Sequence, residues 1–347
     1  MTIAFALQTF KDIEQIERLA RALARGTDDR LTVVSHRGSE QDLQRLARID
    51  AIDRVLPSPG GRARFGALDG LISAMRWLEK QSKPYHWFFV MSGQDYPIRP
   101  LVELEEELAG STFDGYFHHF DALNEAEAMA PPMRWPQTEV VDRYHFHYAV
   151  VKENPTRLDR ALLKLPRLLS ERTHGYRLHT SMGLMLGMRP ARMPFTPDFR
   201  LYGGNYWMTI SRKAVQAVLD FVDERPDVVN YFRGVIAPEE AFIHTVLCNN
   251  PDLKITKREL RFVEFGLKGH GHLKEFDMTN LGPVLASDRY IGRKFDMRRC
   301  PEVLDALDQH IARALEARAF KARATEDATA RGNARQVAGQ APLSQAS

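Results

Sequence analysis

The sequence has little cysteine and no long apolar run, and both absences narrow the class of protein. Only Cys248 and Cys300 occur in 347 residues, too few and too far apart for a disulfide framework or a zinc site. No apolar stretch approaches the ~18 residues that span a bilayer, and no basic segment precedes the short apolar run near the start. We therefore expect ordinary buried thiols, no transmembrane segment and a cytoplasmic location.

Charge of one sign is also scarce, and several ligand-binding motifs are missing. The chain has 48 Lys and Arg against 45 Asp and Glu, a net charge of +3, so no general nucleic-acid surface is expected. It contains no Asp-x-Asp, the spacing by which many nucleotide-sugar enzymes hold Mg²⁺ or Mn²⁺. It also lacks the phosphate-loop, dinucleotide and Gly-x-Ser-x-Gly patterns. We expect no metal and no cofactor.

The residues that are present indicate an α/β protein. Hydrophobic residues make up 44% and charged residues 27%, an ordinary globular mixture. Over the first 120 residues, short apolar strands alternate with helical periodicity, which predicts a mainly parallel central sheet flanked by helices. The expected strands cover residues 3–7, 31–34, 54–56 and 87–91, and a turn with two glycines follows at residues 57–61.

Polar residues directly follow the apolar strand at residues 87–91, in the sequence Ser92-Gly93-Gln94-Asp95. In open α/β sheets, ligands bind at the carboxyl ends of the strands, so this segment is a candidate site. A simple turn is the alternative interpretation. Gln8-Thr9 and Ser35-His36-Arg37 follow two other expected strands and belong at the same edge.

The pattern weakens from about residue 115 to 201, which predicts loops and short helices. A strand is expected at residues 203–210, a helix begun by Ser211, and another helix beginning at Pro238. The last helix is expected at residues 303–320, and the composition of residues 321–347 predicts a disordered tail. We interpret residues 1–320 as one domain, with a nucleotide-binding half (about 1–120) and an acceptor and catalytic half (about 121–320).

Four segments in this order resemble one glycosyltransferase family. They are residues 88–98 (FFVMSGQDYPI), 204–215 (GNYWMTISRKAV), 238–240 (PEE) and 285–296 (LASDRYIGRKFD). Together they resemble the core-2/I-branching β-1,6-N-acetylglucosaminyltransferase and peptide O-xylosyltransferase family. The resemblance implies a GT-A-like fold and an inverting, metal-independent transferase that uses a UDP-sugar and a glycan acceptor. Because animal members carry an N-terminal membrane anchor, this chain is more similar to a bacterial member.

The same resemblance implies roles for three residues. The final acid of a Pro-Asp-Glu segment is the family's general base, and it falls on Glu240 of Pro238-Glu239-Glu240. The alternative is that both acids only interact with a helix dipole, the interpretation we prefer for Glu239. Two basic residues stabilise the leaving diphosphate in the family, and they fall on Lys294 and Lys274, although solvated surface lysines are the alternative.

Further donor contacts are expected from residues near the strand ends. Hydroxyl, amide and carboxylate groups can bind ribose or sugar hydroxyls, and aromatic faces can stack on a pyranose, although Trp207 and Tyr206 could equally be core residues. A metal site at the histidine pairs of residues 145–147 and 270–272 is disfavoured because no cysteine or His-Glu-x-x-His pattern accompanies them. The expected donor-binding set is therefore Ser92, Gln94, Asp95, His36 and Trp207, with Lys294 and Lys274.

Three functions remain open on the sequence. The first is transfer of a sugar from UDP-GlcNAc, with UDP-xylose as the alternative donor. The second is a non-catalytic module that binds a sugar nucleotide or a glycan. The third is a glycoside hydrolase that uses one acid of the Glu239-Glu240 pair with a second carboxylate.

Overall fold

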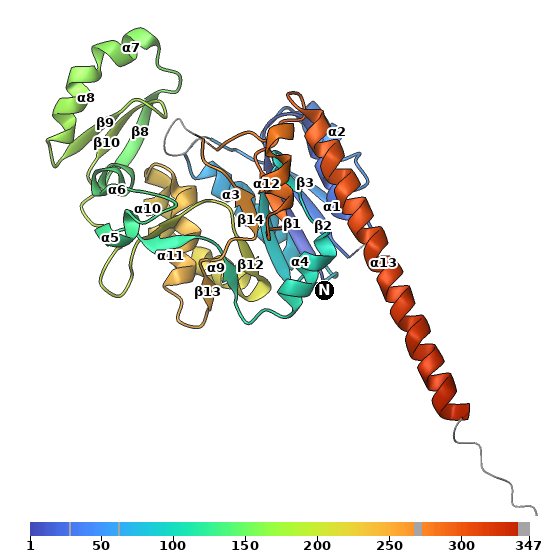
Figure 1. Ribbon diagram of the computed structural model, residues 1–347. Helices are drawn as coiled ribbons and strands as arrows, with labels where there is room; N and C mark the ends of the chain where they lie inside the picture. Colours follow the sequence, from blue (N-terminus) through green and yellow to red (C-terminus); the bar gives the residue numbers. More distant parts are fainter. Residues whose placement is uncertain (28, 62, 267–272, 339–347) are drawn as a thin grey trace, which may run out of the picture.

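The computed structural model describes residues 1–27, 29–61, 63–266 and 273–338, which form an α/β fold around a seven-stranded sheet (Figure 1). β1 pairs in parallel with β2 and β4, β2 with β3, and β6 with β13, whereas β12 is antiparallel to β4 and β6. The mainly parallel sheet predicted from the sequence is confirmed. Its strands, in spatial order, are β13 (Ile255–Thr256), β6 (Gly115–Tyr116), β12 (Thr209–Ser211), β4 (Trp87–Ser92), β1 (Ile3–Thr9), β2 (Leu31–His36) and β3 (Arg54–Pro57).

Two hydrophobic cores cover the two faces of this sheet. Successive side chains of a strand point to opposite faces, so Ala4 and Ala6 of β1 enter one core while Phe5 and Leu7 enter the other. The first core includes residues of α3 (Gly66–Glu79), α9 (Arg212–Glu224), α10 (Pro226–Gly234) and α11 (Phe242–Cys248). The second includes residues of α1 (Ile13–Ala24), α2 (Glu40–Leu46), α4 (Leu101–Ala109), α12 (Leu281–Leu285) and the start of α13 (Pro301–Ala338).

A small three-stranded sheet joins distant parts of the chain beside the main sheet. β5 (Asp95–Pro97) pairs antiparallel with β15 (Ile291–Arg293), which pairs in parallel with β14 (Arg261–Val263). In this register Asp95 lies opposite Arg293. Because of this pairing, β14 with Arg261 and β15 with Arg293 lie beside β5, the segment that follows β4.

The strand expected at residues 203–210 is wrong in its extent, because the chain forms two short strands there. β11 (Tyr202–Gly204) pairs with β7 (His119–Asp121), and β12 begins only at Thr209. Between them the Asn205 side-chain oxygen accepts a hydrogen bond from the Trp207 N–H at 3.0 Å, a local turn that interrupts the extended backbone. Ser211 does begin α9, since its hydroxyl accepts from the Ala214 N–H.

The segment that starts at Pro238 is a single 3₁₀ turn, η1 (Pro238–Glu240), rather than the start of a regular helix. Ala237 before it has a φ of 53°, a left-handed backbone that separates η1 from α10. Burial of Ala237 and Ala241 then fixes the turn between α10 and α11.

The region with the weakest sequence pattern contains short helices and an antiparallel sheet in the order β8-β10-β9. We call residues 147–188 the outer lobe, which lies away from the main sheet in Figure 1. The lobe consists of β8 (His147–Lys152), α7 (Arg157–Leu162), α8 (Lys164–Glu171), β9 (Tyr176–His179) and β10 (Leu184–Met188); α5 (Glu125–Ala128) and α6 (Gln137–Tyr144) precede it.

The last helix, α13 (Pro301–Ala338), is longer than the sequence predicts. The start of α13 packs in the second core through Val303, Leu304 and Leu307. Earlier in the chain, the short 3₁₀ helix η2 (Met278–Asn280) directly precedes α12. Residues 321–338, expected to be disordered, continue the helix, because they are rich in Ala and Arg and contain no proline. Residues 339–347 of the expected tail lie outside the described residues.

Among the described residues, no helix combines the length and apolarity that crossing a bilayer requires. Both cysteines are free, and each is partly exposed rather than fully buried as expected.

Candidate active site

A cavity of about 450 Å³ opens at the carboxyl ends of β1, β2 and β4. Because these strands are parallel, the loops that follow them lie at the same edge of the sheet. Ser92 and Gln94 line the cavity, as the sequence predicts for this edge. The other lining residues are Gln8, Thr9, Phe10, Lys11, Asp12, Arg37, Ser58, Gly60, Gly61, Ala67, Gly93, Trp207 and Arg293.

The glycine turn after β3 forms part of the cavity wall. Gly60 has a φ of 54°, and a Cβ at this position would lie 2.5 Å from Cδ of Arg37. A Cβ on Gly66 would lie 2.0 Å from the Gly60 carbonyl oxygen. The wall is therefore packed too closely for side chains at these two positions, as the sequence predicts for the turn.

Beneath the cavity, one buried carboxylate holds two arginines. The Asp95 carboxylate is fully buried and lies 2.8 Å from Nη1 of Arg293 and 3.2 Å from Nη2 of Arg261. It also accepts hydrogen bonds from the backbone N–H and the hydroxyl of Ser92. Asp95 therefore organises the cavity floor, and its side chain is not itself a lining group.

This cluster carries more positive than negative charge. Two guanidinium groups face one carboxylate, and their Nε atoms, on Arg261 and Arg293, are buried without a hydrogen-bond partner among the described residues. Burial lowers the pKa of Arg261, and the adjacent Arg293 charge acts in the same direction. Because only Arg293 of the two lines the cavity, it is the guanidinium that a ligand can reach.

Trp207 forms a wall of the cavity beside this charge. Its ring centroid lies 4.2 Å from Cζ of Arg293 and 5.3 Å from Cζ of Arg261, both within the range of cation–π attraction. The neighbouring Tyr206 instead donates a hydrogen bond from its hydroxyl to the Ala67 carbonyl at 3.3 Å. Of the two aromatic candidates, the structure therefore brings only Trp207 to the cavity.

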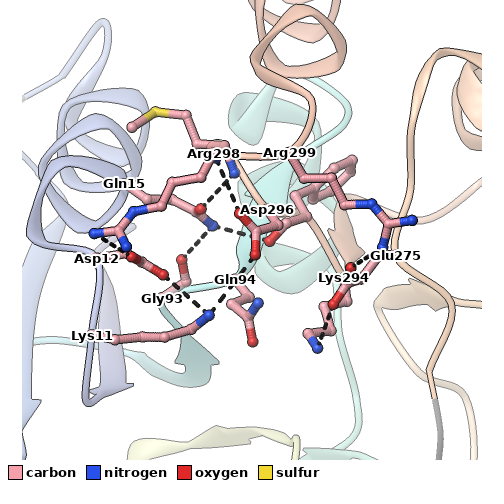
Figure 2. Close-up of polar contacts among 12 residues, drawn as sticks. Lys11, Asp12, Gln15, Gly93, Gln94, Glu275, Lys294, Asp296, Arg298 and Arg299 are labelled. Atoms are coloured by element: carbon pink, nitrogen blue, oxygen red, sulfur yellow. Dashed lines mark hydrogen bonds and ion pairs between the residues drawn. The ribbon is translucent and has the colours of Figure 1, made fainter.

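A network of polar contacts ties the loop after β1 to the segment after β15 (Figure 2). Asp12 lies 3.1 Å from the Lys11 ammonium and 2.8 Å from the Arg298 guanidinium, and Lys11 is also 3.8 Å from Asp296. The buried Gln15 side chain donates to the carbonyls of Gly93 and Phe295 and accepts from the Met297 N–H. The two segments therefore form one rim of the cavity.

The two lysines expected at the diphosphate are both held by carboxylates. Lys294 lies 2.9 Å from Glu275, and Lys274 lies 3.1 Å from Glu264. Lys294 follows directly after Arg293, and Figure 2 shows it beside Glu275, which Arg299 also contacts. Neither lysine is among the residues that line the cavity. Residues 267–272, which include the histidine pair at 270–272, lie outside the described residues.

His36 lies under the cavity rim rather than in it. Its Nδ1 is 2.8 Å from the Thr9 hydroxyl, and burial lowers its pKa. Arg37, the next residue, lines the cavity, and no described carboxylate lies within ion-pair distance of its guanidinium. Arg37, Lys11 and Arg293 are thus cavity cations that the candidate set left out. Arg37 directly follows β2, and Lys11 lies two residues after β1, so their position after parallel strands is the signal that could have found them. Arg293 ends β15 of the small sheet, and no such signal marks it.

Glu239 and Glu240 lie in η1, close to the glycine turn. The Ala237 N–H before them donates to the Ala63 carbonyl at 3.1 Å, which links η1 to the loop that lines the cavity. Glu240 is partly exposed and lies 2.6 Å from Nη1 of Arg143. Burial, together with the adjacent Glu240 charge, raises the pKa of Glu239 to about 8, and its Oε2 has no hydrogen-bond partner among the described residues.

Within the described part of the chain, no group of three or more His, Cys, Asp or Glu side chains is arranged to hold a metal ion.

Comparison with known proteins points to glycosyltransferases. Residues 145–287 match the family model of the Core-2/I-Branching enzyme. The matched segment contains the outer lobe, Trp207, η1 and β14, but not the parallel strands β1 to β4 or β15.

Two curated proteins of Arabidopsis thaliana are similar over a shorter stretch. Beta-glucuronosyltransferase GlcAT14A is 29% identical and GlcAT14B 28% identical over 116 residues, which are 33% of this chain. The aligned part spans only about a quarter, 26%, of each of these relatives. A crystal structure of glucosyl-3-phosphoglycerate synthase from Mycobacterium tuberculosis, with Mn²⁺, UDP-glucose and phosphoglyceric acid, aligns over 82% of this chain and 76% of that one, with 13% identity and a TM-score of 0.28.

Proposed function

We propose that the protein is an inverting, metal-independent glycosyltransferase that transfers a sugar from a UDP-sugar to a hydroxyl of a glycan acceptor. The observation that carries this proposal is the cavity at the strand ends, where Arg293 presents positive charge above Asp95. A nucleoside diphosphate has the size and charge for such a site, and the match of residues 145–287 to a branching-enzyme family supports the reaction class.

In the proposed reaction, the acceptor hydroxyl attacks the anomeric carbon while the UDP oxygen leaves from the opposite face. Glu240 takes the proton from the attacking hydroxyl. Arg293 stabilises the negative charge that develops on the diphosphate, the part a divalent cation plays in other transferases. For Lys294 to join it, its ammonium has to leave Glu275 and turn toward the cavity when the donor binds. For Glu240 to act, Arg143 has to share or release its carboxylate when the acceptor binds.

The donor sugar is proposed to be GlcNAc, with xylose as the alternative. The named activity of the two plant relatives adds glucuronate to the sugars that need testing. A binding module without turnover is the second candidate, favoured by the ion pair that occupies Glu240. Incubation with UDP-GlcNAc, UDP-xylose and UDP-glucuronate, with and without oligosaccharide acceptors, separates these cases by measuring UDP release.

The metal-independent diphosphate site predicts that UDP binds in the presence of EDTA. Calorimetric titration with UDP is the measurement, and loss of binding in EDTA with recovery in Mn²⁺ would contradict the proposal. Replacing Lys294 with Ala should weaken UDP binding by about 1.5–3 kcal/mol, the strength of a charge-assisted hydrogen bond. Lys80→Ala, at the exposed end of α3, is the matched control and should leave the affinity unchanged.

A further inference from the structure

The two helices of the outer lobe turn their apolar sides outward. Leu158 and Leu162 of α7 and Leu165 of α8 are 67%, 69% and 65% exposed. Leu158 and Leu162 are four residues apart and therefore share one face of α7. An amphipathic helix normally buries such a stripe, so this arrangement calls for a partner.

α8 also exposes its apolar side, because a polar face of this helix contacts β9. Ser170 is fully buried, and its hydroxyl accepts a hydrogen bond from the Leu178 N–H at 3.0 Å. Leu165 lies five residues before Ser170, on the other side of the helix at 100° per residue. The helix therefore packs on β9 through a polar face and leaves a leucine stripe exposed, which consists of Leu165, Leu168 and Leu169.

Positive charge is concentrated around these leucines. Residues 151–192 contain nine Lys and Arg against three Asp and Glu, a net charge of +6, although the whole chain carries only +3. Two of the three acids are already paired, Asp159 with Lys152 at 2.6 Å and Glu171 with Arg167 at 3.8 Å. Four further cations of α7, α8 and their ends are exposed, and no carboxylate of the described residues lies within ion-pair distance of them. They are Arg157, Arg160, Lys164 and Arg172.

From this juxtaposition we propose that α7 and α8 dock the protein on a membrane surface that contains anionic lipids. Leucines flanked by arginine and lysine are the composition of helices that lie in the interface, with their apolar side chains among the acyl chains and their cations at the headgroups. A second copy of this chain is disfavoured as the occupant, because two faces of the same positive charge repel each other. Nucleic acid would use the cations but leave the leucines exposed to water.

The docking face is connected to the candidate active site by packing. Met185 of β10 is buried against Ala63 and Ala237, which flank the glycine turn and η1. Docking through α7 and α8 therefore holds the Glu240 region near the lipid surface.

Co-sedimentation of the full chain with vesicles tests this proposal, and it needs neither donor nor acceptor, so its result is independent of the proposed transferase activity. We expect the protein to bind vesicles in which about a third of the phosphatidylcholine is replaced by phosphatidylglycerol, and to bind pure phosphatidylcholine much more weakly. Leu158→Asp with Leu162→Asp should lower the partition coefficient on the order of 100-fold, because two buried apolar contacts are lost and two negative charges are added. Phe320→Asp, at an exposed aromatic residue of α13, is the matched control and should have little effect.

A second pair of variants tests the charge separately. Arg160→Gln with Lys164→Gln should weaken binding to anionic vesicles roughly 10- to 30-fold, whereas Arg48→Gln with Arg54→Gln removes equal charge elsewhere and should not. Unchanged thermal unfolding shows that each variant is folded. Failure of the wild-type chain to bind anionic vesicles, or equal binding by the leucine variant, overturns the proposal. Concentration-dependent dimerisation lost in the leucine variant would assign the face to a second copy instead.

Discussion

Glu239 and Glu240 are neighbours in the chain, yet their carboxylates meet different surroundings. Glu240 is partly exposed and lies in an ion pair with Arg143. No cation in the described part of the chain lies within ion-pair distance of Glu239, and burial raises its pKa to about 8. At neutral pH Glu239 therefore carries a proton and cannot itself act as a base.

Glu240→Gln is predicted to lower turnover by about 10²–10⁴-fold while UDP affinity stays within a few-fold. The amide keeps the size of the side chain and some of its hydrogen bonding, but it cannot accept a proton at neutral pH. Initial rates of UDP release and calorimetric titration of UDP measure the two quantities. Glu239→Gln is the control, and a larger loss of turnover there would place the base at residue 239.

The raised pKa of Glu239 predicts a pH-dependent stability. In the unfolded chain this carboxyl group titrates near 4.5, whereas in the folded protein it stays protonated up to about 8. The folded state thus binds more protons between these values, and the free energy of unfolding falls as the pH rises through them. From about pH 6 to pH 8 the Glu239 contribution should fall by roughly 2 kcal/mol.

Urea denaturation of the wild type and of Glu239→Gln at both pH values measures this change. The variant cannot ionise at this position, so its stability should fall less over the same interval. Parallel curves for the two proteins would show that Glu239 is ionised in the folded state.

At the scale of elements, the cavity rim depends on one side chain of α1. Gln15 is 2% exposed, and it donates at 2.8 Å to the Gly93 carbonyl and at 3.1 Å to the Phe295 carbonyl. It also accepts at 2.8 Å from the Met297 N–H. These contacts join α1, the turn after β4 and the segment after β15, three parts of the chain that share no continuous secondary structure.

Gln15→Ala is predicted to lower the free energy of unfolding by about 2–4 kcal/mol, because three backbone groups lose their partner in a buried place. Chemical denaturation gives this value directly. Gln44→Ala, on the exposed side of α2, removes a single contact with Glu40 and should change the free energy of unfolding by less than about 0.5 kcal/mol. Equal effects of the two substitutions would mean that the Gln15 contacts do not stabilise the rim.

The whole molecule combines a well-packed sheet with a loosely packed lobe. β1 and β4 are buried along nearly their whole length between two large cores. In the outer lobe, Met185 is the one strand residue of β8 to β10 that is fully buried in a hydrophobic cluster, together with Ala63, Ile236 and Ala237. Local opening of the lobe should therefore require less free energy than opening of the sheet.

Hydrogen exchange followed by mass spectrometry should show this difference. Peptides that cover β8 to β10 are expected to exchange faster than peptides that cover β1 and β4, in the absence of any ligand or membrane. Anionic vesicles should slow exchange in α7 and α8 if these helices dock on lipid. Uniform protection across the lobe and the sheet would contradict the packing difference.

Local patterns predict much of the fold of residues 1–120. The apolar runs at residues 3–7, 31–34 and 87–91 lie within β1, β2 and β4, because fully buried parallel strands need continuous apolar residues. The order of strands and helices then places Ser92 and Gln94 at the cavity by the geometry of parallel sheets alone. The cap at Ser211 is equally local, since the hydroxyl and the N–H it accepts from are three residues apart.

Only the tertiary structure decides the charges of the site. Asp95 meets Arg261 and Arg293, which lie 166 and 198 residues away, and Glu240 meets Arg143 across 97 residues. No periodicity reports such pairs, because they depend on how β5, β14 and β15 pair. The sequence could not predict the exposure of the leucine stripe of α8 for a related reason. An amphipathic pattern predicts a helix with one apolar face, but whether that face packs inward depends on which side of the helix meets β9.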